Sequence, residues 1–293
     1  MHRRGWRSAL ALVGLALVGC GAAGPGTGPA SPSGHGTVSV LYAGSLVNLM
    51  ENDLGPAFSK ATGYTYQGYG AGSDELVSDI KGKVKTGDVF ISANPSVNQG
   101  LEGTANGGYV SWYSTFAQAP LVLGYNPKSR FAADFRSEPW YQVVTQPGIL
   151  VGRTDPVLDP KGKLTSEAVG DAATLLGMPS LNSALSSWPV FPEETLVGRL
   201  EAGQLDAGFF YSFEATAQSI PTVSLSPIGL MATFTVTTLN NAPNPQGAEA
   251  FVSYLLGPSG RAVLQKEGVQ LLQTTLSGPV GSVPESLRSL VGV

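Results

Sequence analysis

Cysteine and histidine are nearly absent from this chain, which has one Cys and two His among 293 residues. A single cysteine cannot form an intramolecular disulfide, and two histidines cannot build a His-rich metal site. One of them, His2, is next to the first residue, and the other, His35, lies in a stretch rich in Gly, Pro and Ser. No nucleophile can be paired with a general base in the sequence. We therefore expect a protein that is not an enzyme and has no cofactor.

Charged residues are also scarce, at 13% of the chain, and acidic ones are in excess. The chain has 21 Asp and Glu against 17 Lys and Arg, and three of the basic residues (Arg3, Arg4 and Arg7) precede Cys20. The net charge is therefore −4 for the whole chain and −7 after residue 20. Such a chain repels a phosphate backbone, so we exclude nucleic acid as a partner. An anionic ligand would have to be held by local geometry.

The apolar run near the N-terminus, residues 9–18, is too short to span a bilayer. It follows the three arginines, as in a secretory signal peptide. The run ends in Leu17-Val18-Gly19-Cys20, which resembles the lipobox of bacterial lipoproteins. This resemblance implies that residues 1–19 are a lipoprotein signal peptide and that Cys20 is lipidated. The protein would then be extracytoplasmic and lipid-anchored to the cell membrane. The alternative is an ordinary signal peptide with an incidental cysteine.

Residues 20–36 carry no Asp, Glu, Lys or Arg and are rich in Gly, Ala, Pro and Ser. This composition predicts a flexible tether between the lipid and a folded body. The body begins near Thr37 and is long enough for two lobes, each with its own core. No long linker interrupts it, so the lobes would be closely connected.

Strand and helix patterns alternate after Thr37, which predicts an α/β fold with mostly parallel sheets flanked by helices. We assign residues 37–117 to a first lobe and residues 118–229 to a second. The chain then returns to the first lobe over residues 230–270. Residues 271–293 show no strong pattern after Leu272, and we expect a tail that packs loosely on one lobe.

Individual elements can also be predicted. Two β-rich runs, residues 119–125 and 231–238, are expected to cross between the lobes. Gly63 is expected to end the first helix, after Pro56 has kinked or restarted it. A second apolar stripe ends in Val84, so its helix is expected to reach Gly87. Residues 192–202 also show helical spacing.

The step Ala-Gly-Ser occurs twice where a strand pattern turns into a helix pattern, at Ser45 and at Ser73. A serine at a helix N-cap presents a hydroxyl beside unpaired backbone N–H groups at the positive end of the helix dipole. Such a corner can hold an anion without a charged side chain. Two corners that converge on one cleft would form an oxyanion site. Alternatively, each serine simply caps its helix.

These corners and two further segments resemble the molybdate- and tungstate-binding proteins of bacterial ABC importers, over residues 38–268. The matching segments are Tyr-Ala-Gly-Ser-Leu at 42–46, Gly-Ala-Gly-Ser at 70–73 with Asp-Val-Phe-Ile-Ser-Ala at 88–93, Asp-Ala-Gly-Phe-Phe-Tyr at 206–211, and the helical stretch 244–260. The resemblance implies a two-lobed, type II periplasmic binding protein fold with its ligand in the interlobe cleft. It implies a monomer that binds molybdate or tungstate and passes it to ABC importer permease subunits.

Carried over to this chain, the resemblance places Ser45 and Ser73 on the oxyanion through their hydroxyls. Backbone N–H groups of the corners, which include Gly44 and Gly72, would bind it as well. Tyr211 would donate its phenolic hydroxyl from the second lobe. For Tyr211 the alternative is a core aromatic.

The loop between residues 152 and 160 resembles one in which an aspartate coordinates the metal of the oxyanion and makes it six-coordinate. Asp159 is the best match and Asp155 the second. The archaeal relatives supply a second carboxylate, a glutamate, where this chain has Phe210 and Tyr211. Glu214 lies nearby but is displaced. The site is therefore either a hybrid or a plain tetrahedral one, in which Asp159 caps a helix.

Other functions remain open at this point. The same type of lipoprotein could bind sulfate, phosphate or ferric iron, and iron would use tyrosines such as Tyr109, Tyr113 and Tyr125. A surface lipoprotein without a small ligand is a further alternative.

Overall fold

A nine-stranded mixed sheet organises the residues that the computed structural model describes, 34–293. All of them lie within one unit of the chain, Pro32–Val293. The predicted signal peptide, Cys20 and most of the predicted tether lie outside the described residues. The strand order is β2-β1-β3-β8-β4-β6-β5, and β7 and β9 also pair with β4. The strands are β1 Thr37–Ala43, β2 Thr65–Ala71, β3 Val89–Ser92, β4 Tyr113–Tyr125, β5 Val151–Gly152, β6 Ala207–Tyr211, β7 Thr222–Ser224, β8 Met231–Thr238 and β9 Gln270–Ser277.

Helices connect and flank the strands. The α-helices are α1 Val47–Leu49, α2 Gly55–Thr62, α3 Ser73–Lys81, α4 Asp134–Ser137, α5 Trp140–Val143, α6 Pro160–Leu176, α7 Ser180–Ser187, α8 Leu196–Glu201, α9 Ser212–Ala217, α10 Pro245–Leu256 and α11 Pro258–Lys266. Shorter turns are the 3-10 helices η1 Gly44–Leu46, η3 Pro95–Gly100, η4 Thr104–Asn106, η5 Glu193–Thr195, η6 Val280–Ser282 and η7 Glu285–Leu287, with a π-helical segment η2 at Met50–Leu54. The α/β class is therefore as predicted.

The sheet is mixed rather than mostly parallel, because two long strands join its two parts. β1 pairs in parallel with β2 and β3, and β5 pairs in parallel with β6. β8 runs antiparallel to both β3 and β4. β4 continues past β8 and pairs antiparallel with β6 from Leu121 to Tyr125. The two predicted crossing strands thus link both parts of the sheet, whereas the lobe boundaries themselves stay predictions.

The N-terminal elements follow local sequence signals. The π-helical segment η2 passes directly into α2, which has Pro56 in its first turn and ends at Gly63 with a φ of 84°. Only a residue tolerant of the left-handed region caps a helix in this way. The next helix, α3, ends at Lys81 and not near Gly87, and Val84 is 69% exposed. The helix predicted at residues 192–202 is a 3-10 turn followed by α8.

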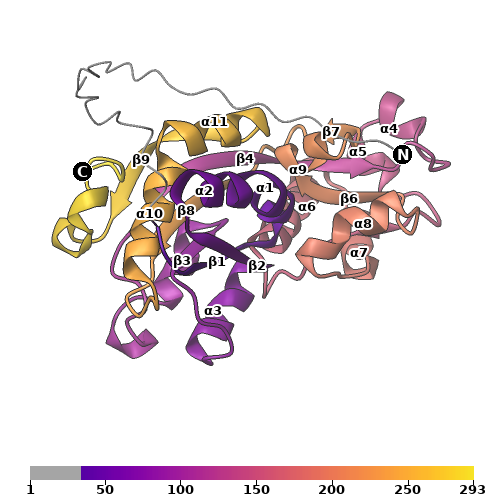
Figure 1. The fold of residues 1–293 in the computed structure, drawn as a ribbon. Helices are drawn as coiled ribbons and strands as arrows, with labels where there is room; N and C mark the ends of the chain where they lie inside the picture. Colours follow the sequence, from indigo (N-terminus) through magenta and orange to yellow (C-terminus); the bar gives the residue numbers. More distant parts are fainter. Residues whose placement is uncertain (1–33) are drawn as a thin grey trace, which may run out of the picture. The chain divides into compact units, whose positions relative to one another are not determined.

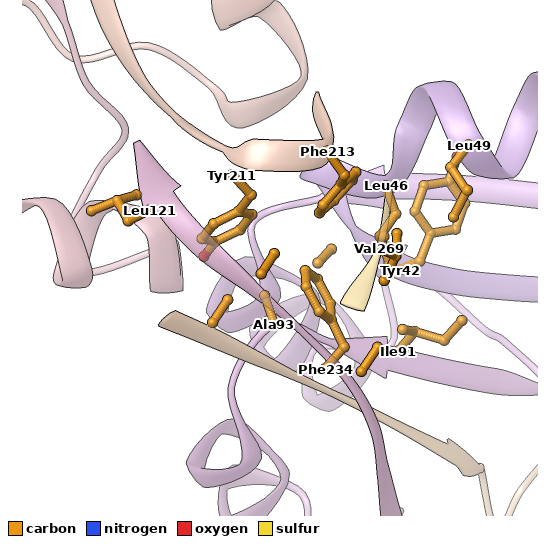
Figure 2. Close-up of a cluster of buried hydrophobic side chains, with 14 of the residues drawn as sticks. Tyr42, Leu46, Leu49, Ile91, Ala93, Leu121, Tyr211, Phe213, Phe234 and Val269 are labelled. Atoms are coloured by element: carbon orange, nitrogen blue, oxygen red, sulfur yellow. The ribbon is translucent and has the colours of Figure 1, made fainter. Parts of the chain in front are cut away.

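Segments far apart in the sequence share the main core. Helix α10 packs on β1, β3 and β8, so N-terminal and C-terminal parts lie side by side (Figure 1). Aromatic rings from β6, α9 and β8 meet in this core. Tyr211 and Phe213 both pack edge-on against Phe234, with 5.8 Å between ring centroids in each pair (Figure 2). The ring of Tyr211 is therefore fixed by packing.

The prediction of a loosely packed tail is wrong. β9 pairs antiparallel with β4 from Gln270 to Ser277. Beyond it, Val283, Leu287 and Val291 are at most 2% exposed and belong to the main core. These three residues recur every four positions, a helical spacing that our prediction overlooked, although the chain forms only the short turns η6 and η7 here.

Leu287→Ala should lower the free energy of unfolding by about 2–4 kcal/mol, because it empties a buried position. Val293→Ala is the control, since that side chain is 62% exposed and its truncation should cost less than about 0.5 kcal/mol. Urea unfolding curves measure both. Equal stabilities of the two variants would contradict this packing.

Candidate functional site

The first Ala-Gly-Ser corner joins β1 to the 3-10 helix η1. Its N-cap is Ala43, so the prediction that Ser45 is the cap is wrong. Ser45 is only 5% exposed, and its hydroxyl has no hydrogen-bond partner within residues 34–293. A carboxylate lies directly against this corner: a Cβ on Gly44 would be 3.0 Å from Oε2 of Glu193. The glycine thus makes room for Glu193.

The second corner joins β2 to α3, and here the N-cap is Gly72 rather than Ser73. Ser73 is fully buried, and its hydroxyl oxygen accepts a hydrogen bond of 3.2 Å from the backbone N–H of Ala93. The backbone N–H groups of Asp74 and Glu75 both donate to the carbonyl of Leu158, at 3.1 Å. The sequence had suggested that these N–H groups are unpaired. That prediction is wrong, because both donate to Leu158. A carbonyl dipole already occupies the N-terminus of this helix.

The two aspartates of the following loop have different roles. Oδ1 of Asp159 accepts from the backbone N–H of Lys161 at 2.9 Å, so Asp159 is the N-cap of α6. Its other oxygen, Oδ2, is buried without a hydrogen-bond partner in the part of the chain that the structure describes. Asp155 is only partly buried and accepts from the N–H of Val157 at 2.7 Å. Helix capping therefore accounts for one half of the Asp159 carboxyl group and leaves the other half free.

Tyr211 ends β6 and is completely buried. Its ring packs against Phe213 and Phe234, as an ordinary core aromatic would. Its hydroxyl, however, has no hydrogen-bond partner among the described residues. Buried hydroxyl groups are nearly always hydrogen-bonded, so this one calls for a partner that the described residues do not supply.

A buried ammonium group, which the sequence did not suggest, lies beside these residues. Lys161 is fully buried, and its Nζ is 2.9 Å from Oε1 and 3.1 Å from Oε2 of Glu214. The same nitrogen lies 3.3 Å from Oε1 of Glu193. Glu214 also accepts from the backbone N–H of Tyr211 at 2.7 Å. We name Asp159, Lys161, Glu193 and Glu214 the buried ionic cluster.

Burial dominates the electrostatics of this cluster. Desolvation, with the nearby charge of Glu193, raises the pKa of Asp159 to about 8. Burial also raises the pKa values of Glu193 and Glu214, although Lys161 opposes the rise. Burial on its own would lower the pKa of Lys161, but the three carboxyl groups outweigh it and raise the value. The ammonium therefore stays charged.

Two cavities of about 300 Å³ each border the cluster, and Glu193 lines both of them. The first is lined by Gly44 and Ser45 of the first corner and by Phe213 and Glu214. The second is lined by residues of the second corner and the aspartate loop, namely Gly72, Thr154, Asp155, Leu158 and Asp159. Both predicted corners therefore reach cavities that border the same cluster.

No helix within residues 34–293 has the length and apolarity needed to cross a membrane.

A family model described as bacterial extracellular solute-binding protein matches residues 38–270. The chain belongs to this family. A Haloferax volcanii protein named as an ABC transporter molybdenum-binding protein is 30% identical, over 85% of this chain and 77% of its own length. The molybdate/tungstate-binding protein of Pyrococcus abyssi is 23% identical, over 87% of this chain and 89% of its own length.

Solved structures show the fold. The periplasmic molybdate-binding protein of Azotobacter vinelandii superposes with a TM-score of 0.62 at 18% identity, covering 80% of this chain and all of that one. The solute-binding protein thus has the fold of the type II periplasmic binding proteins. The family description places such proteins outside the cytoplasm.

Some members of the site could be named from the sequence of this solute-binding protein and others could not. Ser45, Ser73, Asp159 and Tyr211 carry local signals at the ends of strands or helices. Glu193 carries none, because it reaches the first corner only through the tertiary fold. Lys161 directly follows Asp159-Pro160 and had one available signal: a lysine in the first turn of a helix is electrostatically unfavourable unless it is paired.

Gly72→Ala should lower the free energy of unfolding by about 1–3 kcal/mol. The new Cβ would lie 2.4 Å from the carbonyl oxygen of Leu158 and would push that oxygen off the N-terminus of α3. Gly170→Ala, in α6, is the control: a Cβ there has no neighbour within 4 Å and should stabilise the helix. Thermal unfolding of both variants tests this close approach, and an unchanged Gly72→Ala variant would refute it.

The stability of the ligand-free protein should fall as the pH rises between about 4 and 8. In this window native Asp159 keeps a proton that the unfolded chain releases, because its pKa is raised to about 8. In Asp159→Asn, the loss of unfolding free energy between pH 5 and pH 8 should be smaller than in wild type by up to about 4 kcal/mol. Asp155→Asn is the matched control. Urea unfolding at pH 5 and pH 8 measures the free energy of unfolding of each variant. An equal change between the two pH values in wild type and Asp159→Asn would disprove the raised pKa of Asp159.

Proposed function

We propose that this solute-binding protein captures molybdate or tungstate and delivers it to the permease subunits of an ABC importer. One observation carries the proposal. Three buried oxygen atoms from separate segments, the hydroxyls of Ser45 and Tyr211 and Oδ2 of Asp159, have no hydrogen-bond partner within the described residues. Leaving buried polar groups unpaired is costly, and a bound oxyanion would supply the partners that these atoms lack. The relatives named for molybdate and tungstate support this class of ligand.

In the proposed complex, Ser45, Ser73 and Tyr211 donate their hydroxyl hydrogens to the oxyanion. Ser73 can do so because its oxygen only accepts from Ala93 and its hydrogen remains free. Backbone N–H groups of the two corners, at Gly44 and Gly72, add further donors. Each hydrogen bond to a charged group contributes about 1.5–3 kcal/mol net, so a handful suffices for tight binding by one protein molecule.

Asp159 has two chemically distinct ways to meet the anion. With its pKa near 8 it is protonated at neutral pH, and Oδ2 can then donate a hydrogen bond to an oxyanion oxygen. If instead the bound metal becomes six-coordinate, the ionised carboxylate would be its ligand. Asp155, with its side chain turned back onto Val157, and Glu214, which holds Lys161 and Tyr211, are better placed to brace the site than to bind.

Anchoring completes the proposal. Residues 1–19 would direct export, and lipidation of Cys20 would hold the protein on the outer side of the cell membrane. The Gly- and Pro-rich tether that follows would let the folded body reach both the ligand and the permease.

Isothermal titration of the folded body, from Thr37 onward, tests the ligand. We expect tight binding of molybdate and tungstate and little or no heat with sulfate, phosphate or ferric iron. Selective binding of one of the latter three would replace the proposed ligand while keeping the binding role. Absence of binding to all five would reject the oxyanion site.

Ser45→Ala and Ser73→Ala should each weaken binding of molybdate by roughly tenfold or more, since each removes a donor to a charged group. Ser45→Ala is the cleaner variant, because its hydroxyl supports no other contact among the described residues. Ser78→Ala, on the exposed side of α3, is the control. Wild-type affinity in both site variants would rule out these corners as the binding site.

A further inference from the structure

The buried ionic cluster contains more negative than positive groups. Within the described residues, Lys161 is the one cation that pairs with its carboxyl groups, whereas Asp159, Glu193 and Glu214 are all potential anions. A dianion entering the adjacent space meets this excess of carboxyl groups. Charges in a dry interior act strongly on one another, so the balance inside the cluster affects any anion bound nearby.

Lys161 connects three segments that are far apart in the sequence. It extends from the first turn of α6 to Glu193 in η5 and to Glu214 in α9. Its Nζ also lies 5.4 Å from the ring centroid of Tyr211. The ammonium is thus next to the proposed hydroxyl donor and to the two glutamates that would repel an anion.

Glu193 is the carboxyl group of the cluster that would compete most directly with an anion at the first corner. Its carboxylate lies against Gly44 of the first corner; burial raises its pKa, and the backbone N–H of Ser45 offsets a small part of that rise. A carboxylate at this position would compete with the proposed ligand for the donors of the corner. Glu193 is therefore placed as an internal competitor, and its Oε1 lies 3.3 Å from Nζ of Lys161.

We propose that Lys161 determines which ligand charge the site accepts: its ammonium restrains Glu193 and offsets the carboxyl groups, so that a dianion can bind among them. This inference rests on the proposed oxyanion site. Lys161 acts here as a positioning and charge-selecting residue. It differs from the corner serines in that its effect must depend on the charge of the ligand and not only on its shape.

The test compares two tetrahedral oxyanions of different charge, tungstate as the dianion and perrhenate as the monoanion. Lys161→Met removes the ammonium and keeps much of the side-chain volume. The ratio of tungstate affinity to perrhenate affinity should fall by about tenfold or more, because the lost attraction scales with ligand charge. Lys163→Met removes an exposed lysine of the same helix, whose partner is Asp74, and should change the ratio by less than about twofold.

Glu193→Gln gives the opposite sign and does not depend on the folding of the lysine variant. It removes one negative charge, retains the ion pair between Lys161 and Glu214, and should raise the tungstate-to-perrhenate ratio. If Lys161→Met does not fold, this variant alone decides. Titrations at constant pH and ionic strength provide the affinities.

The possible failures can be distinguished. Equal losses for both anions in Lys161→Met would assign a purely structural role to the lysine and overturn this inference, while the proposed function would stand. An unchanged or lowered ratio in Glu193→Gln would also overturn it. A wild-type protein that binds neither anion, nor molybdate, would reject the proposed function and this inference with it.

Discussion

The pairing of one buried ammonium with two glutamates is the interaction on which the rest of the site depends. Lys161 is completely buried and its carboxylate partners come from η5 and α9. Removal of one partner from such a pair typically costs about 3–5 kcal/mol, because the other charge is left without compensation. The position of Tyr211 follows from the same contacts, since Glu214 holds both Lys161 and the backbone of Tyr211.

A second constraint comes from the backbone. The carbonyl of Leu158 sits at the N-terminus of α3, where a bare helix would attract an anion. The approach is so close that only a glycine fits at position 72. A helix terminus recognised in a sequence is therefore only a candidate anion site, because another part of the chain can fill it first. In this protein the first corner, with the unpartnered hydroxyl of Ser45, has the stronger geometric support.

Local signals in the sequence predicted much of the fold, including the alternation of strands and helices, the Gly63 cap and the crossing strands β4 and β8. The resemblance to oxyanion-binding proteins, together with the Ala-Gly-Ser corners, predicted Ser45, Asp159 and Tyr211 for one site, and their shared ligand stays a prediction. Local signals missed Glu193, whose role is defined only by tertiary contact, and β9, whose alternation of half-buried residues is weak. Predictions failed where long-range pairing, and not local propensity, determines the structure.

The position of β9 has a consequence for how the chain is made. β4 pairs on residues 113–118 with β9, which is separated from it by most of the second half of the chain. Until residues 270–277 leave the ribosome, this stretch of β4 has an open edge with unsatisfied backbone groups, and such edges are prone to aggregation. A chain interrupted before residue 270 would thus lack the strand that covers this edge of β4. The pairing of β9 therefore couples the solubility of the growing chain to the synthesis of residues 270–277.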